Sequence, residues 1–154
     1  MRPLSNAAPD GDDTTRKHLV RAHLRIAWVG LLTFATFGLA LEGLQGFKSV
    51  SYLGVGNETR RLMWTLAHAH GVGLSLVQIG FAVTSALCLD LPSRMLARAS
   101  WLLNCAFLLI PGGFLLGGLA TYGGDPGIGI LLVPVGALML LAALAAVAGG
   151  LWRR

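Results

Sequence analysis

The sequence predicts an all-α fold, a four-helix bundle integral to a membrane, on three observations. Hydrophobic residues make up 55% of the 154 positions and charged residues only 12%, against about 25% charged residues in an average soluble domain. The hydrophobic residues are concentrated in four runs separated by short polar connections. Each run supplies the roughly 20 residues that an α-helix needs to cross a bilayer. The predicted spans are residues 26–46, 62–89, 95–120 and 128–152.

The segment before the first span differs in composition from the rest of the chain. Residues 1–20 hold Pro, Ser, Asn, Gly and Asp with few large hydrophobic side chains, so we expect a flexible tail there. Residues 21–154 then form the transmembrane domain. Its short connections leave no room for a soluble domain of roughly 50 residues or more.

Capping and turn residues separate the spans. Asn57 and Glu58 are typical of a helix N-cap and an acidic first turn, so the second helix is expected to begin there. Pro92 favours the start of the third helix, where a missing amide costs nothing. The segment Asp125-Pro126-Gly127 predicts a turn. Because that connection is short, the third and fourth helices should be antiparallel neighbours.

The third span contains a proline and several glycines. Pro111 removes an amide and frees the carbonyl of Phe107, so we expect a bend there that opens towards the second helix. Gly113 and Gly117 form a GxxxG spacing, which permits close contact between helices. These residues favour a kinked helix that simply packs against its neighbours. The alternative is a broken helix that lines a ligand or ion site, as in transporters.

The distribution of Lys and Arg predicts the orientation. Nine of the twelve lie at one side of the spans: in the N-terminal segment, just before or in the first turn of the third span, or at the C-terminus. The positive-inside rule then places both termini in the cytoplasm, with the chain in a bacterial inner membrane. The net charge of +5 is explained by anionic lipid headgroups at the inner leaflet. No base-reading motif accompanies the arginines, so no nucleic acid partner is expected.

Two histidines, His68 and His70, lie within the second span. An ionisable side chain at membrane depth is a candidate functional site by default. Residues two apart on a helix point about 200° away from each other, so the two rings should face different neighbours. His68 belongs to a stripe of polar and small residues that is expected to face the bundle interior. The stripe comprises Arg61, Thr65, His68, Gly71 and Ser75.

Helical rise indicates that three spans bring polar groups to a similar depth in the outer half of the bundle. We therefore expect a polar cluster there, with direct or water-bridged contact between Glu42 and His68. Alternatively, His68 bonds to a backbone carbonyl, and Glu42 pairs with Lys48, Arg60 or Arg61 at the interface. A second, structural pair is expected between Gln78 and Asn104. The candidate ligand or polar cluster comprises Glu42, Arg61, Thr65, His68, Ser75 and Pro111.

His68 and His70 are also the candidate cofactor ligands. Haem would need a symmetric dimer or a second ligand such as Met63 or Met139, because His18 and His23 lie at the inner end, far from this site. A closed zinc site would need four protein ligands, and the sequence places few candidate ligand side chains near these histidines. Haem or a metal ion therefore stays an alternative to a hydrogen-bonded structural histidine.

The segment Asn57-Glu58-Thr59-Arg60-Arg61-Leu62-Met63-Trp64-Thr65-Leu66-Ala67-His68-Ala69-His70-Gly71, with Glu42–Lys48 before it, resembles small bacterial four-span membrane proteins of unknown function. The resemblance covers the first two spans. The HxHG element is similar to histidine motifs of haem-binding membrane helices.

The sequence contains no P-loop, HExxH, GxSxG or paired catalytic carboxylates. We therefore expect a non-enzymatic membrane subunit whose outer-half cluster is structural or binds a ligand. The alternatives are a haem- or metal-binding redox or accessory subunit and an oligomeric small-solute or proton-coupled transporter. Besides the lipid bilayer, a second copy or a membrane complex is the expected partner.

Overall fold

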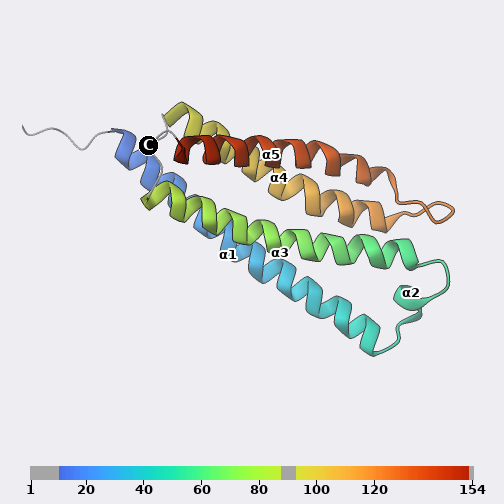
Figure 1. Ribbon diagram of the computed structural model, residues 1–154. Coiled ribbons are helices and arrows are strands. Elements are labelled where there is room, and N and C mark those ends of the chain that lie inside the picture. Colours follow the sequence, from blue (N-terminus) through green and yellow to red (C-terminus); the bar gives the residue numbers. More distant parts are fainter. Residues whose placement is uncertain (1–10, 88–92, 153–154) are drawn as a thin grey trace, which may run out of the picture.

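The computed structural model describes residues 11–87 and 93–152, and this part of the chain is almost entirely helical (Figure 1). The predicted all-α four-helix architecture is confirmed. The long helices are α1 (Gly11–Gly46), α3 (Glu58–Leu87), α4 (Ser93–Leu119) and α5 (Leu132–Leu151). Two short helices precede α3 and α5, namely α2 (Val50–Leu53) and η1 (Ile128–Leu131).

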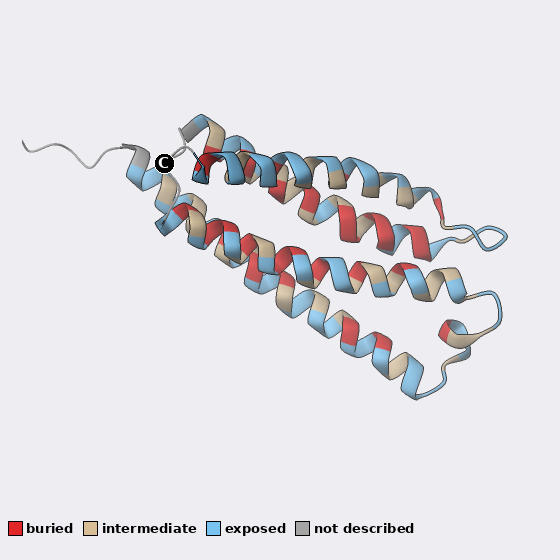
Figure 2. Cartoon of the chain, in the orientation of Figure 1, coloured by how far each residue is buried: buried red, intermediate tan, exposed pale blue. Residues whose placement is uncertain are grey.

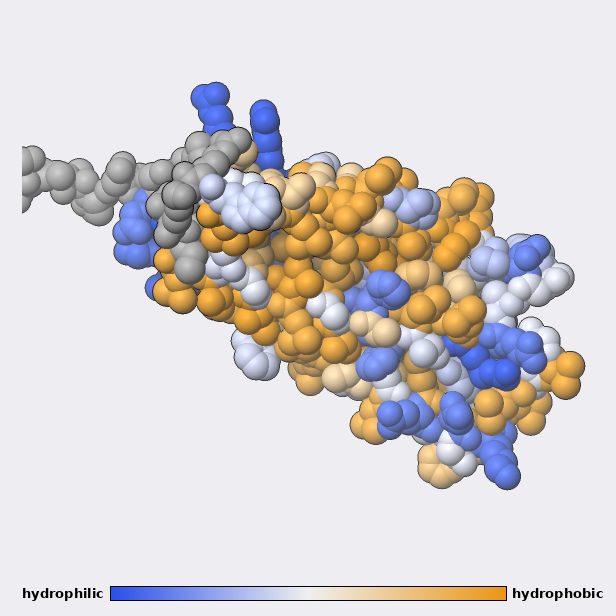
Figure 3. Space-filling model, viewed as in Figure 1, coloured by the Kyte–Doolittle hydropathy of each residue, from blue (hydrophilic) through white to orange (hydrophobic). Residues whose placement is uncertain are grey.

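Each of the four long helical segments is long and apolar enough to cross a membrane. Hydrophobic side chains cover most of the middle of the face shown in Figure 3, and hydrophilic ones gather towards the two ends. The chain thus has the make-up of a multi-pass membrane protein. We call the end that holds α2 and the connection between α4 and η1 the α2 end. The opposite end, where α1 begins and α5 ends, is the terminal end.

Helix α1 begins at Gly11, well before the first hydrophobic run. Residues 11–20, which we expect to be part of a flexible tail, are instead its first turns. Residues 1–10 lie outside the described residues. Within these turns Lys17 Nζ donates to Asp13 Oδ2 at 2.7 Å, a pairing one turn apart that favours a helix. Hydropathy marks where the chain enters hydrocarbon, so it misses a polar extension of the same helix.

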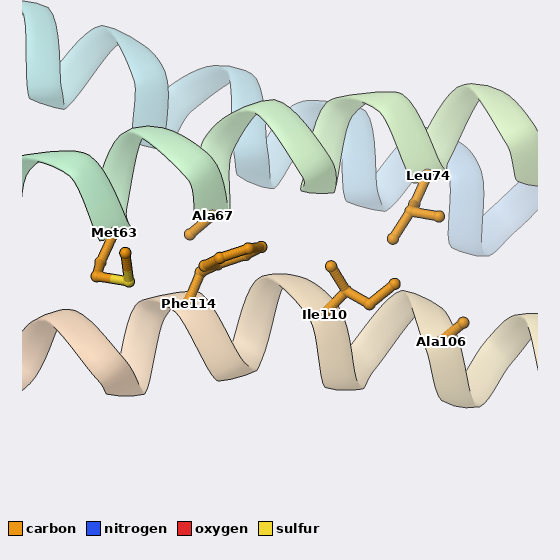
Figure 4. Close-up of a cluster of buried hydrophobic side chains, with 6 residues drawn as sticks. All are labelled: Met63, Ala67, Leu74, Ala106, Ile110 and Phe114. Carbon is orange, nitrogen blue, oxygen red and sulfur yellow. The ribbon is translucent and has the colours of Figure 1, made fainter. Parts of the chain in front are cut away.

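Helices α3 and α4 form the centre of the bundle, and their facing side chains make one of its hydrophobic clusters (Figure 4). Helix α1 packs mainly on α3, and α5 packs mainly on α4. Helix α5 is largely exposed to its surroundings (Figure 2). The cluster in Figure 4 comprises Met63, Ala67 and Leu74 of α3 with Ala106, Ile110 and Phe114 of α4.

Glycines let the helices approach closely at the outer pairings. A Cβ at Gly71 would overlap the ring of Phe34 across the α1–α3 interface, and one at Gly113 would lie 2.8 Å from Val133 of α5. Gly117 is in ordinary van der Waals distance of Ile130. The GxxxG spacing therefore serves helix packing, as expected. Helix α4 continues through Pro111, so the alternative of a broken helix is wrong, and a bend at that residue stays a prediction.

The connections at the α2 end differ in detail from the expectation. The chain reverses at Gly123 and Gly124, whose φ values of 58° and 95° suit glycine, just before the predicted Asp125-Pro126-Gly127 turn. Asn57 does lie directly before α3, and its carbonyl accepts a hydrogen bond from the Arg61 amide at 3.0 Å. Its side chain, however, donates to the carbonyls of α2, at 3.4 Å for Val50 and 3.2 Å for Ser51.

Candidate functional site

The polar cluster expected near the α2 end does not assemble as one site. His68 is half-buried, its Nδ1 donates to the carbonyl oxygen of Phe34 at 2.7 Å, and its ring lies against Gly38. The expected direct contact with Glu42 is not formed. Glu42 is exposed, and no hydrogen bond or ion pair joins it to another described residue. A helix carbonyl, the alternative partner, satisfies the imidazole in its place.

The remaining members of the cluster lie apart. Ser75 is fully buried against Gly30 of α1, as the interior stripe requires. Thr65 is exposed instead, because α1 and α3 diverge towards the α2 end (Figure 1). Arg61 Nη1 donates to the carbonyl of Tyr52 in α2 at 3.4 Å. Pro111 is buried within α4, and no hydrogen bond or ring contact among the described residues joins α4 to His68.

His70 points away from His68, as helical geometry predicts. Its Nδ1 donates to the Leu66 carbonyl at 2.8 Å, and its ring centroid lies 4.8 Å from that of Phe114 in α4. Each imidazole keeps Nε2 as its lone-pair atom, but the two rings rest on different helices. Within residues 11–87 and 93–152 no three His, Cys, Asp or Glu gather as metal ligands. The geometry of both histidines is that of packing groups.

A second polar group ties the connections together at the α2 end. Arg60 Nε donates to the carbonyl of Gly118, near the C-terminus of α4, at 3.1 Å. Its guanidinium carbon lies 5.9 Å from the ring centroid of Trp64, and Tyr52 stacks on the same ring at 6.3 Å. These contacts join α2, α3 and α4, and the alternative pairing of Arg60 or Arg61 with Glu42 is not formed among the described residues.

The most extensive buried polar network lies towards the terminal end and centres on His23. The His23 side chain is 1% exposed, and its Nδ1 bonds to Oε1 of Gln78, which is fully buried in α3. On the other side of the ring, Nε2 lies 2.7 Å from Oγ of Ser100 in α4. Gln78 Nε2 in turn donates to Oδ1 of Asn104 at 3.0 Å. The network joins α1, α3 and α4 and confirms the predicted Gln78–Asn104 pair.

The hydrogen bonds of this network have one consistent direction. Gln78 Oε1 can only accept, so His23 Nδ1 carries the proton, and Nε2 of the neutral ring accepts from the Ser100 hydroxyl. The donors therefore run from Ser100 through His23 and Gln78 to Asn104. Hydrogen bonds in such a chain polarise one another, which strengthens each of them. The last group in the chain is the Asn104 amide, whose Nδ2 has hydrogens left to donate.

Asn104 also lines a groove between α1 and α4. The groove has a volume of about 450 Å³, and its walls are almost wholly apolar. Val29 and Leu108 at its rim are 64% and 69% exposed, so it opens on the outside of the bundle. No described residue accepts a hydrogen bond from Asn104 Nδ2. The lining residues are Ile26, Val29, Gly30, Thr33, Phe34, Asn104, Phe107 and Leu108.

Sequence reasoning missed His23 because it starts the first span at Ile26 and so places the imidazole outside the hydrocarbon. A signal was nevertheless present. Ala27, Gly30 and Gly38 follow the three- and four-residue spacing of a helix face, and His23 continues that spacing by one turn. All four residues are buried. A polar residue that falls on the same helix face as a row of small residues therefore indicates a buried polar site of this kind.

Comparison of the chain with family models, curated proteins and solved structures returns no match. The resemblance of the first two spans to small four-span bacterial proteins stays a prediction.

Proposed function

We propose that this chain is a non-enzymatic protein of the bacterial inner membrane that takes a lipophilic molecule from the bilayer into the groove between α1 and α4. One observation carries the proposal. The Asn104 side chain belongs both to the buried network of His23 and to the wall of an apolar groove that opens on the outside of the bundle. Both termini are cytoplasmic in this proposal, as the positions of Lys and Arg favour.

The shape and chemistry of the groove support a ligand-binding role. Small-molecule sites are concave and mostly apolar, with a few fixed polar groups, and have volumes of about 300–1,000 Å³. The groove meets these conditions with its volume of about 450 Å³ and one amide held by Gln78. A lateral opening admits a molecule that is already dissolved in the hydrocarbon.

The histidines of α3 have a structural role in this proposal. His68 joins α3 to α1 through Phe34, and His70 rests on Phe114 of α4. His68 therefore helps to hold α1, one of the two helices that frame the groove, against α3.

Native mass spectrometry of the protein released from membranes in mild detergent tests the proposal. We expect a discrete small-molecule adduct on wild-type protein. Leu108→Trp fills the rim of the groove and should remove the adduct. Leu138→Trp on α5 is the matched control, because Leu138 is equally exposed at 69% but lies outside the groove. An adduct that survives Leu108→Trp, or none on the wild type, would contradict the proposal.

A further inference from the structure

We propose that the molecule bound between α1 and α4 is a flat, carbonyl-bearing lipophile of the quinone class, and that Asn104 Nδ2 donates a hydrogen bond to its carbonyl oxygen. This inference rests on the proposed function, because it names the kind of ligand that the groove takes. Three features of the described residues carry it: a free donor, its depth, and aromatic walls.

The donor is the end of the hydrogen-bond chain. Asn104 Oδ1 is occupied by Gln78 Nε2 at 3.0 Å, which fixes the amide so that Nδ2 is the atom left over. No described residue accepts from it. The chain from Ser100 through His23 polarises this amide in the direction of donation. The complementary ligand group is therefore an acceptor.

The depth of Asn104 decides what kind of molecule can bring that acceptor. By helical rise Asn104 lies about 16 Å from the start of α4 and about 22 Å from its end. Headgroups and water are remote from that level, and an unsatisfied polar group in hydrocarbon costs several kcal/mol. The acceptor must therefore belong to a molecule that is itself soluble in the middle of the bilayer. A carbonyl on an otherwise apolar ring or chain has that property.

The walls of the groove favour a ring. Phe34 and Phe107 both line it, and their ring centroids lie 6.1 Å apart at an interplanar angle of 84°. Aromatic side chains bind flat π-systems by stacking or by edge-to-face contact. A quinone head offers a flat ring and a carbonyl acceptor together, and its isoprenoid chain matches the apolar rim at Val29 and Leu108.

The test uses wild-type protein in nanodiscs of synthetic phosphatidylcholine and two probes, a decyl-substituted benzoquinone and decylbenzene. The probes share the ring and the chain and differ in the carbonyls. Binding is followed by the shift of the quinone carbonyl stretch in infrared difference spectra and by the rise in melting temperature. We expect the quinone to bind about tenfold more tightly, the effect of one hydrogen bond of about 1.4 kcal/mol. This comparison uses wild-type protein alone, so it does not depend on the folding of a variant.

Two substitutions locate the site. Asn104→Leu removes the donor and should bring the quinone to the affinity of decylbenzene and abolish the carbonyl shift. Leu108→Trp should abolish saturable binding of both probes, whereas Leu138→Trp should leave it unchanged.

Equal affinity of the two probes, with both lost in Leu108→Trp, would overturn the quinone assignment and leave the lipophile-binding groove in place. No saturable binding of either probe would overturn both proposals. If neither probe binds and cross-linking shows a dimer that Leu108→Trp disrupts, a second copy occupies the groove and the quinone assignment is likewise overturned.

Discussion

At the scale of single residues, the buried imidazole of His23 links three helices. Its two ring nitrogens connect Gln78 of α3 with Ser100 of α4, and its ring meets Phe81 edge-on at a centroid distance of 4.6 Å. One imidazole thus fixes the relative register of three helices. A neutral ring suffices, since one nitrogen donates and the other accepts.

His23→Leu should therefore destabilise the bundle by about 1–3 kcal/mol, because it leaves the buried Gln78 oxygen without a donor. The free energy of unfolding in mixed SDS micelles measures this cost. His18→Leu, an exposed change on the same helix, is the control and should have little effect. Adding Gln78→Leu to His23→Leu should cost less than the two single changes together, since both partners of the bond are then gone.

The two histidines of α3 should differ in their effect on stability. His68→Ala removes the bond to Phe34 and leaves a void over Gly38, so we expect a loss of about 1–3 kcal/mol. His70 is exposed and bonds within its own helix, so His70→Ala should cost about 0.5 kcal/mol. The same unfolding titration compares them. Equal losses would show that the environments of the two rings do not matter.

The sequence predicted some of these residues and missed others for a physical reason. The opposite directions of the His68 and His70 rings follow from the angle between helical positions two apart. The Gln78–Asn104 pair follows from their similar depth by helical rise. Both could therefore be predicted from the sequence. The partners of His68 and His23 could not be derived in the same way. Helical rise gives a depth but no rotation of one helix against another, and that rotation decides whether Glu42 or a carbonyl meets the imidazole.

At the scale of helices and turns, interfacial glycines set how closely the helices pack. Gly113 and Gly136 lie at the α4–α5 interface, where a Cβ at Gly136 would lie 2.8 Å from Ile110. Close backbone approach replaces the hydrophobic effect as the source of affinity between helices in lipid. This explains how α5 holds its place although most of its surface is exposed.

Gly113→Val should destabilise the α4–α5 pairing by about 1–3 kcal/mol, because the added Cβ would lie 2.8 Å from the Val133 side chain. Gly112→Val is the matched control. A Cβ there meets nothing within 4 Å, and the change in helix propensity is the same. Unfolding of both variants in mixed micelles measures the difference. If the two valines cost the same, the close contact does not contribute to stability.

The limits of prediction are visible in the short elements. The four spans could be located because hydrophobic runs report burial in hydrocarbon. The first turns of α1, the short helix α2 and the reversal at Gly123 and Gly124 carry no such signal. Helix α2 depends on tertiary contacts, with Tyr52 buried against Trp64 and Asn57 bonded to its carbonyls.

At the scale of the whole molecule, the bundle has a stable centre and more open flanks. Helices α3 and α4 hold the hydrophobic cluster of Figure 4, whereas α1 and α5 each pack mainly on one neighbour. The His23 network is the main polar link from α1 to both central helices. The groove beside it is thus framed by a helix that the network itself holds in place.

The orientation of the whole molecule gives the last prediction. Nine of the twelve Lys and Arg residues belong to the terminal side of the spans, and the α2 end holds only Lys48, Arg60 and Arg61. We therefore expect the α2 end to face the outside of the cell.

In a variant without its native cysteines, Val55→Cys is fully exposed in the connection after α2 and should react with a membrane-impermeant maleimide on intact cells. Asp13→Cys, exposed near the start of α1, should react only after the membrane is opened. Because the two sites report opposite faces, the reverse labelling pattern would invert the topology. Labelling of both sites on intact cells would mean that the chain inserts in two orientations, with the charge asymmetry too weak to choose between them.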